Sequence, residues 1–241
     1  MFDRLSHLNS VKRNTASSGV TPKDAASLLL IDKQSSPYKV LMGKRHKNNS
    51  FMPDVYVFPG GAVEKSDQDK TTAYPSPFLE QRFQFSDQVN KTAFQAALLW
   101  CALRETFEET GLDLLANFGF HPEAKNPDLS WQKLIESCVF LARAITPPSN
   151  KKRFDTRFFI YELPSHFNDK AIAGDELVDL QWVNFQEAQT LNLHVMTRVI
   201  LEDLNDYMER HHLPTQPKGV IFYHMVDKSF CRDWLEIASN S

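Results

Sequence analysis

The sequence predicts an α/β sandwich with a mixed β-sheet rather than a strictly alternating βαβ arrangement. Two observations support this prediction. Short β-rich runs are interspersed with helical stretches in an irregular order, and a helical pattern that begins at Thr92 has apolar side chains on one side and acidic side chains on the other. With 241 residues, of which 42% are hydrophobic and 24% charged, the chain is long enough to bury a sizeable core.

The first half of the chain contains three short apolar runs that we interpret as strands. Residues 25–31 indicate a buried strand, residues 38–42 its hairpin partner, and residues 55–58 a third strand that stops at a Pro-Gly-Gly turn. Residues 66–92 show neither the strand period nor the helical period. We therefore expect an inserted loop there, with a short helix around residues 78–83.

The second half of the chain mixes strand and helix signals. Strands are expected at residues 138–144, 156–162, 177–183 and 220–225, the last being the final strand of the fold. Asn184, followed three residues later by Glu187, predicts a capping box at the start of a short helix. Regularly spaced apolar residues predict a longer helix from His194 to about Arg210.

These elements are expected to form one domain. We predict that residues 1–22 are a disordered or helical N-terminal extension and that residues 23–241 are a single domain with an insertion at about 68–92. The extension contains several basic residues and only one acidic residue, Asp3, so a targeting segment stays open as an alternative.

Charge and cysteine content limit the partners and the compartment. A formal net charge of -3 gives no electrostatic reason to expect nucleic acid or an anionic membrane as a partner. The 3 cysteines are far apart in the sequence and lack C-x-x-C spacing, which favours a reducing compartment. We therefore expect a cytoplasmic protein with a small-molecule partner, no nucleic acid and no membrane, and a homodimer stays open.

Three glutamates in the helical stretch suggest a metal site. Glu105, Glu108 and Glu109 stand at i, i+3 and i+4, so their carboxylates project from one stripe, while Phe107 falls on the opposite, apolar side. Like charges at these spacings cost about 0.2–0.5 kcal/mol per pair, and a hard cation such as Mg²⁺ or Mn²⁺ would remove this cost. A solvated acidic face is the alternative for an isolated stripe. The neighbouring Arg104 and the helix stop at Gly111 favour the metal site.

The segment from Gly61 to Leu112 resembles the signature of the Nudix hydrolases, G-x5-E-x7-R-E-U-x-E-E-x-G-U, in which U is aliphatic. Arg104-Glu105-Thr106-Phe107-Glu108-Glu109-Thr110-Gly111-Leu112 matches its second half, and Glu64 matches a glutamate often found three residues after the glycine. The chain departs from the signature in three ways. Asp67 stands where the first Glu is expected, a long insertion separates it from Arg104, and Thr106 replaces an aliphatic residue. The resemblance implies a Nudix-type α/β/α sandwich.

An interrupted signature of this kind is similar to one Nudix subgroup, that of the peroxisomal coenzyme A diphosphatase and its bacterial relatives. Three stretches share this similarity: Phe51-Met52-Pro53 leading into Phe58-Pro59-Gly60-Gly61, Arg104-Glu105-Thr106-Phe107-Glu108-Glu109, and Ile145-Thr146-Pro147-Pro148 followed by Arg153-Phe154-Asp155-Thr156-Arg157-Phe158-Phe159. The C-terminal Ser239-Asn240-Ser241 is not a peroxisomal address, so we do not transfer that location.

The resemblance implies hydrolysis of a nucleoside diphosphate linked to another group, by attack of water on one phosphorus of the diphosphate. It assigns metal binding to Glu105, Glu108 and Glu109, one of which can also act as base. Glu64 is assigned to the outer shell of the metal, with a loop carboxylate as the alternative, and Arg104 to the orientation of a glutamate, with a surface ion pair as the alternative. Glu176 is a candidate further ligand or base, with a turn residue as the alternative.

Substrate binding is assigned to five positions: the turn glycines Gly60 and Gly61, Arg45 from a basic run, Arg157 as a phosphate contact, and Phe154 as a ring that stacks on a base. A solvated loop is the alternative for the basic run, and core packing is the alternative for the ring.

Three functions compete. The first is hydrolysis of coenzyme A or acyl-coenzyme A to 3′,5′-ADP and (acyl-)4′-phosphopantetheine. The second keeps the chemistry and changes the substrate to ADP-ribose, NADH or another nucleotide. The third is a nucleotide-binding module without catalysis, against which the three intact glutamates argue.

Overall fold

A computed structural model of the chain describes residues 3–10, 17–48, 52–73, 92–117, 127–165, 167 and 170–237. Within these residues the strands are β1 Lys23–Asp32, β2 Lys39–Arg45, β3 Tyr56–Val57, β4 Gly60–Ala62, β5 Cys138–Ile145, β6 Phe154–Glu162, β7 Leu177–Val183, β8 Gly219–Val226 and β9 Ser229–Glu236. The helices are α1 Arg4–Ser10, α2 Lys65–Ala73, α4 Thr92–Thr110, α5 Leu114–Asn117, α6 Pro127–Ser137, α7 Phe185–Ala188 and α8 Val195–Arg210.

The strands form one mixed sheet, as the sequence predicts. Its main path runs β3-β2-β1-β6-β5-β8-β9, with β4 paired to β1 and β7 paired to β2. The pairs β1–β6 and β5–β8 are parallel, and the other pairs are antiparallel. The sheet is central because both of its faces are apolar. Strand β1 shows this directly, since its residues are buried almost without interruption.

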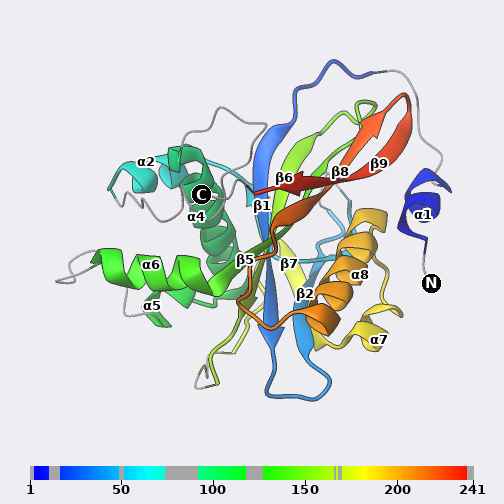
Figure 1. Cartoon of the computed structure of the whole chain (residues 1–241). Coiled ribbons are helices and arrows are strands. Elements are labelled where there is room, and N and C mark those ends of the chain that lie inside the picture. The colour runs from blue at the N-terminus through cyan, green and yellow to red at the C-terminus, as the bar shows by residue number, and fades with distance from the viewer. Residues whose placement is uncertain are drawn as a thin grey trace.

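Helices cover both faces of the sheet, so the predicted α/β/α sandwich is confirmed. Figure 1 shows α2, α4, α5 and α6 on one side of the sheet and α7, α8 and α1 on the other. One core cluster joins α4 and α6 to side chains such as Leu28 and Phe159, and a second joins α8 to side chains such as Leu29 and Ile160. Within the described residues, no helix has the length and apolar composition needed to cross a membrane.

Helix α4 begins and ends where the sequence predicts, but the two-sided prediction is wrong for its first half. Every residue from Gln95 to Leu103 is buried, because the helix is wedged between the sheet and α6. Phe107, predicted on the apolar side, is 53% exposed. Thr106 is fully buried, and its hydroxyl donates to the Ala102 carbonyl at 2.7 Å, which explains how a polar residue is accepted at an aliphatic position. Gly111 ends the helix with a φ of 71°.

The predicted loop at 66–92 is partly wrong, because its first part is the helix α2. That helix is polar, with the sequence Lys-Ser-Asp-Gln-Asp-Lys-Thr-Thr-Ala, and it buries only Asp67 and Thr71, so the periodicity that predicts helices is missing. The short helix expected at residues 78–83 lies outside the described residues.

Residues 220–225 do form a strand, β8, but it is not the final one. A tight turn at Asp227 and Lys228, both with positive φ, connects it to the antiparallel strand β9. The turn lacks the Asn-Gly or Asp-Gly pair that normally marks such a hairpin, so the sequence gives little warning of it. The other predicted strands and helices are present, with the expected capping box at Asn184.

Part of the predicted N-terminal extension packs on the domain. Leu8 of α1 is fully buried in the cluster around α8, and the Arg4 guanidinium donates to the Asp206 carboxylate at 2.8 Å. The Asn9 amide oxygen accepts the Phe230 N–H at 2.8 Å, so it satisfies one backbone donor at the exposed edge of β9.

Candidate active site

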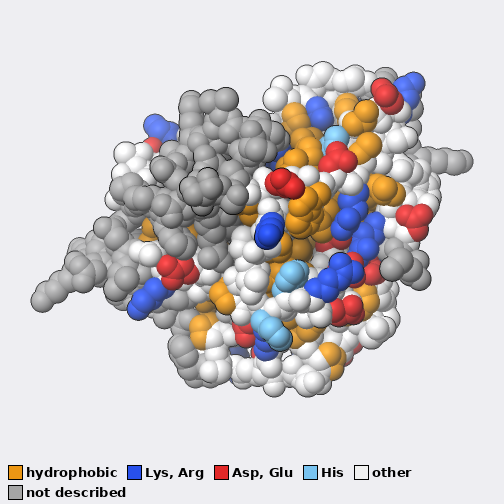
Figure 2. Space-filling view, viewed as in Figure 1, with side chains coloured by type: hydrophobic (Ala, Val, Ile, Leu, Met, Phe, Trp, Pro, Cys, Tyr) orange, Lys and Arg blue, Asp and Glu red, His pale blue; other side chains and the backbone are white. Residues whose placement is uncertain are grey.

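A cavity of about 940 Å³ extends between the two helical layers. Its walls come from β1, the turn around β4, one residue of α4, the β5–β6 connection and the first turn of α8. In Figure 2, hydrophobic side chains gather in a band across this face of the molecule, with acidic, basic and histidine side chains along the band. The cavity therefore offers both apolar surface and charged groups to a ligand.

The glycine turn brings α4 close to the sheet. Gly60 has a φ of 155°, and a Cβ there would lie 2.4 Å from the Ala26 carbonyl oxygen. Its N–H donates to the Glu109 carboxylate at 2.9 Å. A Cβ on Gly61 would lie 2.2 Å from Oε1 of Glu105. The two glycines thus leave the space in which two of the predicted glutamates meet the turn.

Arg104 is the centre of the polar network. Its Nε and Nη2 donate to the two oxygens of Asp67, each at 3.0 Å, and Nη2 also donates to the Ala62 carbonyl at 3.1 Å. Its Nη1 donates to Glu105 and Glu108, each at 2.9 Å. The guanidinium therefore connects α2, β4 and the acidic stripe of α4 through charge-assisted bonds.

Asp67, which stands in the sequence where the signature has its first glutamate, lies beside Arg104. Although 37 residues separate it from Arg104, the two side chains form a bidentate pair, and Asp67 is 1% exposed. Its second oxygen also accepts the Glu64 N–H at 2.9 Å, which ties the pair to the end of the glycine turn. The insertion does not separate the carboxylate from the arginine.

Burial makes the acidic stripe electrostatically uneven. Glu109 is only 4% exposed; its burial, with the nearby charges of Glu105 and Glu176, raises its pKa to about 8, although the Gly60 N–H opposes the shift. Burial also raises the pKa of Glu105 above its ordinary value, against the lowering effect of Arg104. The Glu108 side chain is 54% exposed. Two of the three carboxylates are therefore harder to ionise than a carboxylate in water.

Carboxylates such as these suit a hard divalent cation, but in their present geometry they do not form a metal site. Among the described residues, no group of three or more His, Cys, Asp or Glu side chains is arranged to hold a metal ion. Arg104 Nη1 bridges Glu105 and Glu108, and Glu109 is bound to the glycine turn. The donor set nevertheless consists of carboxylates, two of them with pKa values raised by burial, and a bound cation would reverse that effect.

A comparison with known protein families agrees with this geometry. Residues 95–204 match the family model described as the NUDIX domain. The chain contains a Nudix domain. The matched region begins in α4 and includes the acidic stripe.

Individual relatives of this Nudix domain are distant. A Caenorhabditis elegans protein that carries the name nudix hydrolase 7 is 30% identical over 159 residues, which is 57% of this chain and 43% of that protein. The acyl-coenzyme A diphosphatase NUDT19 of Xenopus laevis is 31% identical over 108 residues, which is 37% of this chain and 28% of that protein. The matched regions thus span less than half the length of either relative.

Among solved structures, the crystal structure of a Nudix hydrolase from Alicyclobacillus acidocaldarius has a TM-score of 0.58 at 22% identity. The match covers 82% of this chain and 100% of that chain. It establishes the Nudix fold.

The structure brings most of the predicted site residues of this Nudix domain to one cavity. Its lining includes Arg45, Gly60, Gly61, Glu64, Glu105, Phe154 and Glu176. Arg104, Glu108 and Glu109 are not in the lining but are joined to it through the hydrogen bonds described above. The roles of these residues in binding and catalysis stay predictions.

Arg157 does not occupy the position expected of a phosphate contact. It is 4% exposed, and its Nη1 pairs with Asp24 at 2.7 Å and donates to the Asp155 carbonyl at 2.7 Å. It is absent from the cavity lining, whereas its neighbours Thr156 and Phe158 belong to it. Strand alternation explains this placement, because adjacent residues of β6 face opposite sides of the sheet.

The sequence also missed cavity residues on α8. His194, Val195, Met196 and Thr197 all line the cavity, although they are distant in sequence from the glutamates. Periodicity identified this segment as a helix start but gave no sign that the start faces the site. The available signal was His194 at the cap position, where its Nδ1 accepts the Met196 N–H at 3.2 Å.

Proposed function

We propose that this Nudix domain is a metal-dependent hydrolase of the diphosphate linkage in a nucleoside diphosphate derivative, with coenzyme A or acyl-coenzyme A as the substrate. The products would be 3′,5′-ADP and (acyl-)4′-phosphopantetheine. The observation that carries the proposal is the Arg104 network, which orders the acidic stripe beside a glycine turn at one end of a cavity of about 940 Å³.

Each part of the network has a task in this reaction. Arg104 holds Glu105 and Glu108, and the Gly60 N–H holds Glu109, so all three carboxylates are kept beside the glycine turn. Gly61 leaves room for the Glu105 carboxylate beside the turn.

The acidic stripe, with Glu64, would hold Mg²⁺ or Mn²⁺. When bound, the cation supplies charge neutralisation at the diphosphate and lowers the pKa of a water molecule. Glu176 lines the same cavity and is our candidate for the base that accepts the water proton.

Two observations favour coenzyme A derivatives over other nucleotides. One of the relatives is the acyl-coenzyme A diphosphatase NUDT19 of Xenopus laevis. The cavity also has apolar walls, to which Met52, Phe58 and Met196 contribute, and such walls suit a pantetheine or acyl chain. Cytoplasmic location and a homodimer stay predictions of the sequence.

The test is a substrate panel, with and without Mg²⁺ or Mn²⁺, followed by mass spectrometry of the products. The panel contains coenzyme A, acyl-coenzyme A, ADP-ribose and NADH. We expect metal-dependent turnover that is greatest for coenzyme A or its esters. Faster turnover of ADP-ribose or NADH would overturn the choice of substrate, and binding without any turnover would favour the non-catalytic module.

A matched pair of variants tests the acidic stripe. Glu108→Gln is expected to abolish metal-dependent turnover while the protein stays folded, because a carboxylate of the proposed metal site is lost. Glu209→Gln removes an exposed carboxylate near the end of α8, remote from the cavity lining, and is expected to retain turnover. Equal activity of the two variants would contradict the metal assignment.

A further inference from the structure

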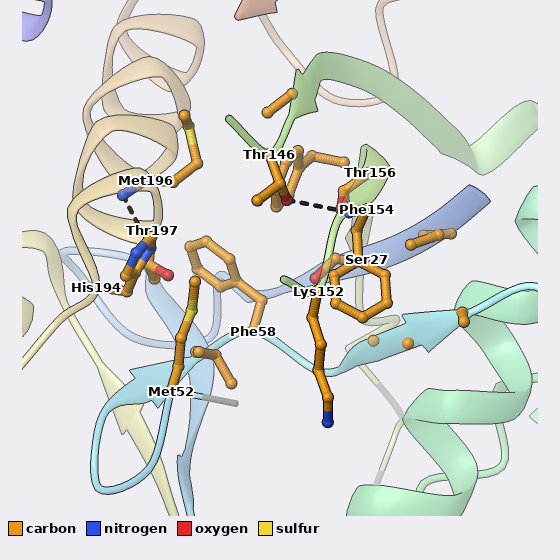
Figure 3. A pocket seen from close by; sticks show the side chains of 18 of the residues that line it. Ser27, Met52, Phe58, Thr146, Lys152, Phe154, Thr156, His194, Met196 and Thr197 are labelled. Carbon is orange, nitrogen blue, oxygen red and sulfur yellow. Dashed lines mark hydrogen bonds between the residues drawn. The ribbon is translucent and has the colours of Figure 1, made fainter. Parts of the chain in front are cut away.

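The side of the cavity that α8 and β9 form is apolar. Figure 3 shows Met196 on the first turn of α8, with the ring of Phe58 close by and Phe154 on the other side of the cavity. The apolar residues that line this side are Ala144, Phe158, Val195, Met196 and Phe230. A surface of this composition suits an aliphatic group of a ligand better than a charged one.

Phe230 lies on the part of the β8–β9 hairpin that extends beyond the rest of the sheet. Strand β8 pairs with β5 as far as Tyr223, whereas the β8–β9 ladder continues to Val226 and Ser229. Among the described residues, the tip of the hairpin therefore has no further strand beside it. Because a two-stranded hairpin is only marginally stable by itself in water, other contacts must hold Phe230 at the cavity wall.

Helix α1, which lies beside this hairpin, supplies such contacts (Figure 1). The Phe230 N–H donates to Oδ1 of Asn9 at 2.8 Å, and Nδ2 of Asn9 donates to the Phe230 carbonyl at 3.5 Å. An antiparallel neighbouring strand would exchange the same two bonds with Phe230. One exposed side-chain amide thus takes the place of a strand at the tip of the hairpin.

Helix α1 is also anchored to α8. Leu8 is fully buried in the core cluster that includes α8 and Phe230. Nε of Arg4 lies 3.1 Å from the buried carboxylate of Asp203, which in turn accepts the hydroxyl of Tyr223 at 2.7 Å. Helix α1 therefore joins α8 to the β8–β9 hairpin, and these are the two elements that form the apolar side of the cavity.

We propose that Phe230 is a specificity-determining contact for an aliphatic group of the substrate, and that Asn9 is the positioning residue that keeps Phe230 at the cavity wall. The inference rests on the proposed function, in which the diphosphate binds beside the glutamates of the same cavity. Both residues lie outside the region 95–204 that matches the Nudix family model. The N-terminal helix thus gives this chain a means of substrate selection that is separate from the acidic stripe.

Calorimetry on the full chain without divalent metal tests the proposal in the absence of turnover. Octanoyl-coenzyme A and acetyl-coenzyme A are titrated into the wild-type protein and its variants. The two ligands share the nucleotide and the diphosphate, so the ratio of their affinities reports on the aliphatic chain alone. Each methylene group that is buried contributes roughly a factor of four in affinity.

The variants separate the amide of Asn9 from its helix. Asn9→Leu removes the amide, Asn9→Gln keeps an amide at this position, and Phe230→Ala removes the ring. Ser10→Ala is the matched control, because Ser10 is an exposed neighbour whose hydroxyl donates to the His7 carbonyl within α1. Since Asn9 is exposed, its replacement leaves no cavity in the core, and its variants decide the test even if Phe230→Ala does not fold.

We expect the wild-type protein to bind octanoyl-coenzyme A at least about twentyfold more tightly than acetyl-coenzyme A. The ratio should fall at least about fivefold in Asn9→Leu and Phe230→Ala, and stay within about twofold of the wild-type ratio in Asn9→Gln and Ser10→Ala. A wild-type ratio near one would overturn the proposal. An unchanged ratio in Asn9→Leu, or an equal fall in Asn9→Leu and Asn9→Gln, would also overturn it.

The outcome separates this inference from the proposed function. If neither ester is hydrolysed with Mg²⁺ or Mn²⁺ but the ratio changes as expected, the hydrolase assignment fails and the roles of Phe230 and Asn9 stand. If the esters are hydrolysed and the ratio is near one, these roles fail and the hydrolase assignment stands.

Discussion

Neutralising Asp67 tests whether the Arg104 network holds the insertion to the domain. The Asp67 side chain is 1% exposed and the Arg104 side chain 14% exposed, and Asp67→Asn removes the charge with little change of shape. Breaking a buried ion pair costs about 3–5 kcal/mol. We expect the low end of this range, about 3 kcal/mol of the free energy of unfolding, because Arg104 keeps Glu105 and Glu108 as partners. For a chain of this length, that loss lowers Tm by roughly 6–12 °C.

Thermal unfolding followed by circular dichroism measures the loss, and urea unfolding gives the free energy directly. Asp69→Asn is the matched control, because Asp69 is an exposed aspartate on the same helix. Its Tm should stay within about 2 °C of the wild-type value, as for most surface substitutions. The reasoning is refuted if Asp67→Asn and Asp69→Asn have the same Tm.

Three further outcomes follow from the turn and the thiols. Gly61→Ala should lower turnover of the best substrate by at least about tenfold and leave Tm nearly unchanged. The alanine Cβ would displace only the movable carboxylate end of Glu105. Undiminished turnover would contradict this role of Gly61. Gly60→Ala should lower Tm by roughly 10 °C or prevent folding, because its Cβ would meet the backbone of Ala26; a wild-type Tm would show that the turn can relax. Ellman's reagent should titrate Cys231 alone in the native protein and all three cysteines in denaturant, since the other two are buried; fast reaction of a second native thiol would be inconsistent with the packing.

The elements that could be predicted from the sequence are those whose signal is local. Residues 25–31 and 177–183 show strand patterns that depend only on neighbouring residues, and the stop of α4 at Gly111 depends on the conformational freedom of one glycine. The acidic stripe could be predicted for the same reason, since helical spacing alone puts Glu105, Glu108 and Glu109 together.

The features that could not be predicted depend on partners far away in the sequence. Helix α2 has no apolar period, and its one fully buried charge, Asp67, is stabilised by an arginine 37 residues later. Arg157 was expected to face a substrate, but its side of β6 is decided by the register with β1 and by the pair with Asp24. The contribution of α8 to the cavity depends on the pairing of Tyr56 with Asn192 and Leu193.

The cost of interrupting the signature is small beside the cost of breaking the Asp67–Arg104 pair. The signature expects a short link between the first acidic residue and the arginine, and here α2 and the chain up to Thr92 stand between β4 and the acidic half of α4. Each doubling of a flexible link adds about 0.6 kcal/mol of closure cost, so a link several times longer costs about 1–1.5 kcal/mol. Breaking the Asp67–Arg104 pair is expected to cost about 3 kcal/mol, because it leaves one charge buried without its partner, and this is the larger quantity. A chain that keeps this pair can therefore accept an insertion of variable length between Asp67 and Arg104. The pair, rather than the length of the link, decides whether the acidic stripe is ordered.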